Sequence, residues 1–141
     1  MIEVTLPLPP TANNMFFNLK NGGRAKTTQY KDWLRIAKAE MEVAYLRHRK
    51  PVYGDKQSMA LTVIVGANYR RDITNCVKAV EDALCAFLPI PDDRYNDRVL
   101  IERDLTIEGH VKATIAPLMC GEKADNISPA SAENEITGGS A

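Results

Sequence analysis

Charged residues near the middle of the chain have the types and spacing for chemistry on a phosphate group. Arg70 and Arg71 meet Asp72 where a helix is expected to begin, Lys78 follows inside that helix, and the Asp92–Asp93 pair comes just after it. Carboxylates bind divalent cations such as Mg²⁺, which prefers oxygen ligands, and basic side chains hold phosphate. A metal so held would activate water and stabilise charge on the phosphate, which suits cleavage of a nucleic-acid backbone.

Each of these positions also has a structural explanation. Asp72 suits the N-cap of the helix that follows it, with or instead of Thr74. Asp92–Asp93 after Pro91 is ordinary turn chemistry. Taken one at a time, the structural roles are the more frequent ones, so spacing alone gives only a weak indication of a metal-dependent phosphodiesterase.

The helix expected from about Ile73 places three polar residues on one flank. At 100° per residue, Thr74, Lys78 and Glu81 fall together beside the apolar stripe and not opposite it. The stripe has spacings of three and four and consists of Ile73, Val77, Val80, Leu84 and Phe87. As isolated residues, Lys78 and Glu81 would form a solvated flank. Together with the acids that flank the helix, they belong to the candidate site.

Composition limits the class of protein. The chain has 141 residues and 45% hydrophobic content, which is enough for one domain with a real core. Its 18 basic and 18 acidic residues cancel, but the stretch from Met119 onward has four acidic residues and one lysine, leaving 17 basic and 14 acidic residues before it. This weakly basic body is compatible with nucleic-acid binding and does not demand it.

Several function classes receive no support from the sequence. Met1–Val4 is acidic and strand-like with no signal pattern, and no apolar run approaches the roughly 20 residues of a membrane span. The three cysteines lack CxxC spacing, which favours reduced thiols and a cytoplasmic protein over a disulfide framework or a zinc site. His48 and His110 have no metal-ligating partner at a suitable spacing, and we expect both at the surface.

The elements that must position the candidate site follow from periodicity and from proline and glycine breaks. We expect strands at Glu3–Leu6, Met59–Val65, Arg98–Arg103 and Leu105–Ala116, helices at Thr28–Arg49 and from Ile73 to about Pro89, and a loop from Thr11 to Lys26. The Glu108–Gly109 pair could shift the last turn later. This β-α-β-α-β-β order predicts a small α+β domain over residues 1–118, with a mixed sheet packed by two helices. Residues 119–141 read as an acidic, disordered tail.

The combination of motifs resembles the RusA family of Holliday junction resolvases, small nucleases encoded by bacteria and their phages and prophages. The resemblance covers roughly Val4 to Pro117. Four features carry it in order: Leu8–Asn14 after the first strand, the basic loop with Arg24 and Lys26 leading to Tyr30, Arg71–Asn75 with Lys78 and Asp82–Leu84, and Asp92–Asp93. In this order and at these intervals they are far more specific than any one of them.

The resemblance implies an Mg²⁺-dependent cluster of three aspartates with a nearby lysine. Asp72 and Asp93 match two of the acids and Lys78 matches the lysine, but Thr74 stands where the middle aspartate belongs. Three accounts are open. Asp92 could complete the metal site with Asp72 and Asp93 while Thr74 orders a water; Glu81 could substitute, although it lies about 10 Å along the helix from Thr74; or the protein could bind branched DNA without cutting it efficiently. We favour an active or weakly active nuclease.

The resemblance also implies a homodimer acting on four-way junction DNA, because two symmetric nicks suit two sites related by a two-fold axis. No small-molecule substrate is expected. Recognition would rest on shape and phosphate contacts. The residues expected against DNA are Asn13, Asn14, Arg24, Lys26, Arg70 and Arg71. Phe16 or Phe17 could wedge at the crossover point, with core packing as the alternative for either.

Overall fold

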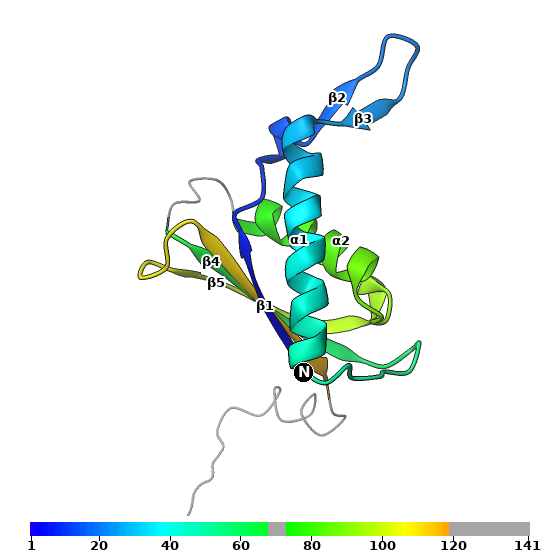
Figure 1. Ribbon diagram of the computed structural model, residues 1–141, viewed down its shortest axis with the longest axis vertical. Helices are drawn as coiled ribbons and strands as arrows, with labels where there is room; N and C mark the ends of the chain where they lie inside the picture. Colours follow the sequence, from blue (N-terminus) through cyan, green and yellow to red (C-terminus); the bar gives the residue numbers. More distant parts are fainter. Residues whose placement is uncertain (68–72, 119–141) are drawn as a thin grey trace, which may run out of the picture.

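A computed structural model of the chain describes residues 1–67 and 73–118 (Figure 1). Its elements in chain order are β1 (Ile2–Pro7), η1 (Ala12–Asn14), β2 (Phe16–Asn18), β3 (Arg24–Lys26), α1 (Thr28–Arg47), β4 (Met59–Gly66), α2 (Ile73–Phe87), η2 (Asp93–Tyr95), β5 (Asn96–Asp104) and β6 (His110–Pro117). The two η elements are short 3-10 turns. The prediction of a small α+β domain with a mixed sheet and two helices is confirmed. The predicted tail, residues 119–141, lies outside the described residues.

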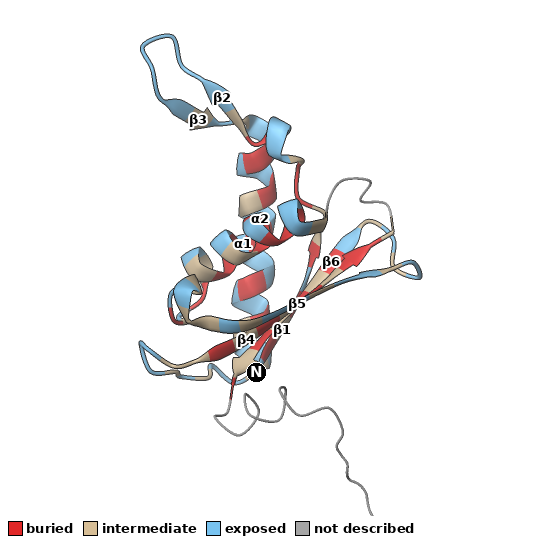
Figure 2. Ribbon diagram, turned by 180° about the vertical axis from the view of Figure 1, so that it is seen from behind, coloured by how far each residue is buried: buried red, intermediate tan, exposed pale blue. Residues whose placement is uncertain are grey.

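Four strands form one sheet in the order β1-β6-β4-β5. β4 and β5 run parallel, with α2 as the crossover between them, whereas β1 and β4 both pair antiparallel with β6. Burial alternates along β1, where Ile2, Val4 and Leu6 are buried and Glu3 and Thr5 are not, so the helices cover one face of the sheet (Figure 2).

The core lies between that sheet face and the two helices. Leu61 and Val63 of β4 and Met41 of α1 are fully buried. Helical spacing puts Tyr30, Ala37, Met41 and Ala44 on one face of α1, and all four are buried. Trp33 is buried with them, whereas Leu34 is half-buried. Trp33 is held there because its indole Nε1 donates to the backbone oxygen of Pro7 at 2.8 Å. The indole therefore buries its apolar surface without leaving its donor unpaired.

Apart from the start of the last strand, the predicted bounds of the helices and main-sheet strands lie within two residues of the observed ones. Two of the differences have local reasons. α1 ends at Arg47 and not at Arg49, because Arg49 and Lys50 adopt left-handed backbone with φ of 67° and 51° just before Pro51. The last turn comes later than the residues Leu105–Ala116 implied, and β6 begins only after Gly109, whose φ of 72° suits glycine.

The prediction of a loop from Thr11 to Lys26 is wrong, because this segment folds into η1 and a β2–β3 hairpin. Phe16 pairs opposite Lys26, and Gly22 and Gly23, both at φ 86°, reverse the chain. The hairpin projects beyond the first turn of α1 (Figure 1). Its base is anchored because the Phe16 ring packs edge-on against Tyr30, with centroids 5.5 Å apart. Strands of three residues are too short to leave an alternating pattern.

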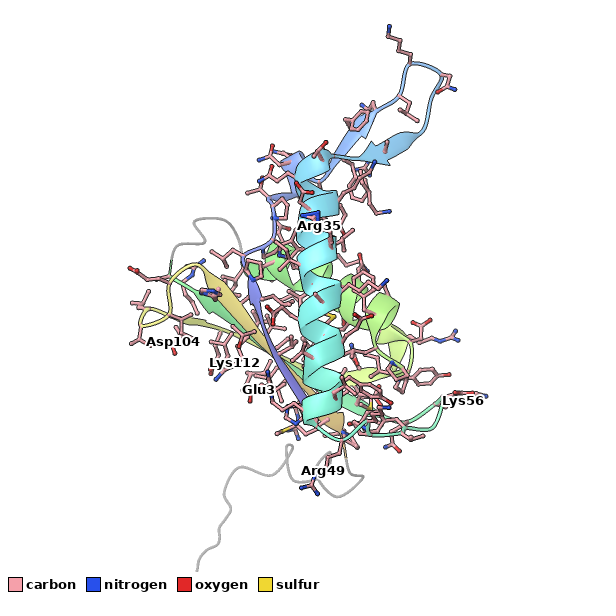
Figure 3. The ribbon with its side chains drawn as sticks, in the orientation of Figure 1. Glu3, Arg35, Arg49, Lys56, Asp104 and Lys112 are labelled. Atoms are coloured by element: carbon pink, nitrogen blue, oxygen red, sulfur yellow. The ribbon has the colours of Figure 1, made fainter. Side chains whose placement is uncertain are left out.

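Charged side chains are spread over the whole body. Figure 3 labels Arg35 on the half of α1 near the hairpin, whereas Arg49 and Lys56 lie at the opposite end of the molecule. Arg35 is paired with Asp32 one turn earlier, at 3.5 Å. Arg49 and Lys56 are therefore basic residues far from the hairpin (Figure 3), suitable as control positions for charge changes in it.

Candidate functional site

Lys78 lies at the centre of a cluster of charges on α2. Its Nζ is 3.0 Å from Asp82 Oδ1 and 3.5 Å from Asp93 Oδ2. The hydrogen bond to Asp82, followed by the charge of that carboxylate, raises the pKa of Lys78, and Asp93 adds to the effect. Lys78 is therefore a cation that joins α2 to η2. The ammonium is still exposed, so it can also reach a bound phosphate.

Asp92 and Asp93 have different structural roles. The Asp92 carboxylate caps η2 by accepting from the Arg94 backbone N–H at 3.2 Å, and this bond lowers the pKa of Asp92. Asp93 begins η2, is half-buried and turns toward Lys78. The turn-forming explanation therefore applies to Asp92, while Asp93 is the member that joins the cluster.

Glu81 lies one turn further along α2 and contacts the start of β5. Its Oε2 accepts from the Asn96 side-chain amide at 2.8 Å. Close by, burial, together with the charges of Asp93, Glu81 and Asp92, raises the pKa of the Cys85 thiol to about 11. Three carboxylates therefore lie near this one thiol.

The donor chemistry of this cluster fits a hard cation. Mg²⁺ is usually held by one or two carboxylates, with water and substrate phosphate completing its octahedron. Asp93 supplies one such carboxylate beside Asp92, while Asp72, Arg70 and Arg71 lie outside the described residues. Within residues 1–67 and 73–118, no three acidic, histidine or cysteine side chains are grouped to hold a metal ion. Thr74, where the resemblance leads us to expect an aspartate, is exposed on α2.

A pocket of about 290 Å³ connects the cluster to the hairpin. The residues that line it come from two parts of the chain: Ala12, Met15, Phe16 and Arg24 on one side, and Asn75, Lys78, Ala79 and Asp82 of α2 on the other. The Arg24 guanidinium lies over the Phe16 ring, 4.5 Å from its centroid. Two cations therefore line one pocket, and an extended phosphate backbone could contact both.

The expected DNA-contacting residues that the structure describes lie at this end of the molecule. Asn13 and Asn14 are exposed in η1, and Arg24 and Lys26 are exposed on β3. The structure separates the two phenylalanines by role, because Phe16 packs on Tyr30 whereas half of the Phe17 surface is exposed. Of the two rings, Phe17 is therefore the one that could contact DNA, because Phe16 packs at the hairpin base.

Asp82 belongs to a motif that carries the resemblance, but neither Asp82 nor Asn96 was assigned a function from the sequence. The Lys78–Asp82 spacing of four residues on a predicted helix was an available signal, since such residues are neighbours on the helix surface. Asn96 gave no local signal, because its partner Glu81 is 15 residues away. Asp82 positions Lys78, and Asn96 positions Glu81.

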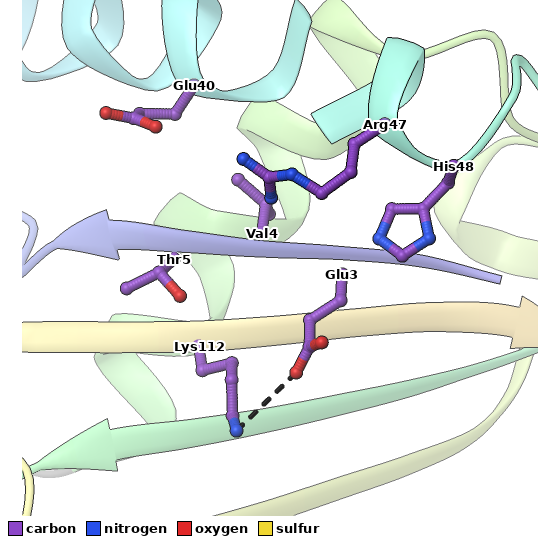
Figure 4. A pocket seen from close by; sticks show the side chains of 7 residues that line it. All are labelled: Glu3, Val4, Thr5, Glu40, Arg47, His48 and Lys112. Carbon is purple, nitrogen blue, oxygen red and sulfur yellow. Dashed lines mark ion pairs between the residues drawn. The ribbon is translucent and has the colours of Figure 1, made fainter. Parts of the chain in front are cut away.

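A larger pocket of about 480 Å³ lies around the β1 edge of the sheet (Figure 4). Arg47 at the end of α1 and the cap residue His48 line one side of it, and on the other side Glu3 and Lys112 form an ion pair of 3.5 Å. Its charges are mixed and it contains no residue of the Lys78 cluster. His48 is half-buried here and not at the open surface, whereas His110 is exposed as predicted.

Comparisons with protein-family models and with curated proteins find no match for this chain. Neither α1 nor α2 has the length and apolar character of a membrane-spanning helix.

Proposed function

We propose that this protein is an Mg²⁺-dependent, structure-selective endodeoxyribonuclease of the RusA type, which resolves Holliday junctions by paired symmetric nicks. One observation carries the proposal. Lys78 and Asp93, 15 residues apart in the chain, lie 3.5 Å apart beside a pocket that Arg24 also lines. An acid, a lysine and a second cation in one place suit phosphodiester hydrolysis better than any other chemistry the chain offers.

Each residue has a defined part in this proposal. Asp93, with Asp72 and Asp92, would hold Mg²⁺, which when bound supplies an activated water and neutralises charge on the phosphate. Lys78 contacts the scissile phosphate or the leaving oxygen, and Asp82 keeps its ammonium in place between substrate contacts. Arg24 holds a neighbouring phosphate, and the exposed Asn13, Asn14 and Lys26 contact the backbone further along.

The substrate sets the expected assembly. A four-armed junction has two-fold symmetry, so a homodimer with one site per subunit would place two nicks symmetrically. Such DNA is a cytoplasmic substrate in bacteria. A labelled synthetic four-way junction incubated with Mg²⁺ should yield paired nicks, and a matched linear duplex should yield none.

A second candidate function is a branched-DNA-binding dimer with little or no turnover. Thr74 favours it, because a threonine brings no charge to the position where the resemblance expects an acid. That protein would bind the junction in preference to duplex in a salt-sensitive way. It would give no Mg²⁺-dependent product above background, and this result distinguishes it from the nuclease.

Thr74→Asp should raise the junction-cleavage rate by about tenfold or more, because a further carboxylate strengthens a site built from oxygen ligands. The measurement is the single-turnover rate over an Mg²⁺ titration, with Thr74→Asn as the uncharged control. An unchanged rate and an unchanged Mg²⁺ dependence would show that the lack of a carboxylate at residue 74 does not limit cleavage.

Arg24→Glu should weaken junction binding by about tenfold, because it replaces a phosphate-contacting cation with an anion in the pocket. Binding is measured by fluorescence anisotropy at two salt concentrations. Lys56→Glu makes the same charge change at the opposite end of the molecule (Figure 3) and should weaken binding far less. Equal losses in the two variants would mean that only net charge matters.

A further inference from the structure

The outer edge of β5 is an unpaired strand edge of unusual length. β5 pairs with β4 on one side, and among the strands of residues 1–67 and 73–118 none pairs with the other (Figure 2). The strand has nine residues, and at its centre Val99 and Leu100 expose 42% and 46% of their surface. An edge of this kind is a template for pairing with another chain unless it is blocked.

The charges of β5 are arranged symmetrically about Leu100. Two copies paired antiparallel about a two-fold axis at Leu100 bring together these residues: Arg98 with Glu102, Asp97 with Arg103, and Val99 with Ile101. Opposite charges therefore meet on both sides of an apolar centre, and the pattern complements itself under the operation that a two-fold dimer requires.

Neighbouring registers lose this match. Outward-facing backbone groups meet their counterparts only when the register changes by two residues. A shift centred on Val99 sets Arg98 against Leu100, and one centred on Ile101 sets Leu100 against Glu102. The register centred on Ile101 keeps one opposite-charge pair, Arg98 with Asp104, but it also sets Val99 against Arg103. The register centred on Leu100 is therefore favoured, because it alone combines an apolar centre with two kinds of opposite-charge pair.

Arg98 supplies a second observation. It is half-buried, and its Nε is buried with no hydrogen-bond partner. Within the described residues neither Arg98 nor Glu102 takes part in an ion pair, whereas Asp97 already accepts a hydrogen bond from the Ser58 hydroxyl. Because this chain already encloses the Nε, a facing Glu102 carboxylate would meet the terminal guanidinium nitrogens of Arg98. The Arg98–Glu102 pairs are therefore available to form across the two edges.

We infer that two copies of this chain associate through their β5 edges in the register centred on Leu100, joining two four-stranded sheets into one. The homodimer itself is part of the proposed function, and this inference assigns it a surface. η2 leads directly into β5, so the two Lys78–Asp93 clusters become related by the same axis. The complementary edge belongs to β5 alone, so the dimer would form whether or not the protein cuts DNA.

Charge reversal on the full chain tests the inference. In sedimentation velocity across a dilution series, Arg98→Glu should weaken the dimer by about tenfold or more, because two like-charged pairs replace two opposite ones. Glu102→Arg should do the same, and the double variant Arg98→Glu/Glu102→Arg should regain the dimer. A monomer throughout the wild-type series, or a dimer that neither reversal weakens, overturns the inference.

Cysteine crosslinking tests the register independently of cleavage. Leu100 faces itself across the axis at a Cα separation within reach of a disulfide. Leu100→Cys should give an oxidised dimer on non-reducing gels well above the wild-type background. In this register the two copies of residue 105 are far apart, so Leu105→Cys should not. Equal crosslinking of both variants overturns the register whether or not the protein cuts DNA.

Discussion

Asp93→Asn should abolish junction cleavage, with a loss of about 10²-fold or more, because of the two carboxylates that lie against Lys78, Asp82 and Asp93, it removes the one proposed to bind Mg²⁺. Asparagine keeps the shape and an oxygen but brings no charge to a cation. The loss should be similar at every Mg²⁺ concentration if the acid acts at the transition state. It should shrink at high Mg²⁺ if the acid mainly binds metal. Single-turnover rates over an Mg²⁺ titration separate the two outcomes.

The fold should survive this substitution. The Lys78 side chain is exposed and that of Asp93 is partly exposed, and ion pairs open to solvent contribute at most about 1 kcal/mol. Unfolding by urea should therefore be nearly unchanged, and so should junction binding without Mg²⁺. Asp55→Asn, on an exposed position of the loop before β4, is the matched control and should cut normally. Full activity of Asp93→Asn would remove Asp93 from the proposed chemistry.

Gly66→Ala should destabilise the domain by about 1–3 kcal/mol, because the new methyl group has no room. A Cβ at Gly66 would lie 2.6 Å from the His110 backbone oxygen and 3.0 Å from that of Ile107. Both are backbone atoms, so no side chain can turn away to make space. The end of β4 would separate from the turn before β6, where the Ala67 N–H donates to Ile107 at 2.7 Å.

Urea unfolding followed by circular dichroism measures this effect as a lower midpoint with an unchanged slope. Gly54→Ala is the matched control, because nothing lies within 4 Å of its added methyl. It should leave the midpoint nearly unchanged. Equal urea midpoints for the two variants would show that the backbone around Gly66 moves to make room for the methyl group without loss of stability.

The helices and long strands were predictable because their patterns are local. The stripe of α2 gave both the helix and its buried face, and burial extends from it to Cys76, Ala79 and Ala83. Because cysteine and alanine are small, these positions did not stand out as part of the apolar stripe, and the predicted buried face was too narrow. The hairpin was not predictable, since its stability comes from the Phe16–Tyr30 contact and not from its three-residue strands.

The candidate site was predictable only in part. No spacing rule brings Lys78 to Asp93, because the approach depends on where α2 ends and how η2 turns back. The family resemblance named both residues without placing them. The contact between Glu81 and Asn96 could not be foreseen, since it depends on the same turn. The division of roles within Asp92–Asp93 came from the capping geometry of η2.

The pairing of β1 with β6 has a consequence for how the chain folds during synthesis. The first strand finds its partner only when the last one is made, since Ile2 lies opposite Ile115. β4 must likewise wait for β5 and β6, so no pair of the main sheet can form from the first 95 residues. Until then, among the described elements, only the two helices, the short 3-10 turns and the β2–β3 hairpin can form locally. Such non-local topology slows folding and leaves the apolar strand β4 exposed to chaperones as the ribosome finishes the domain.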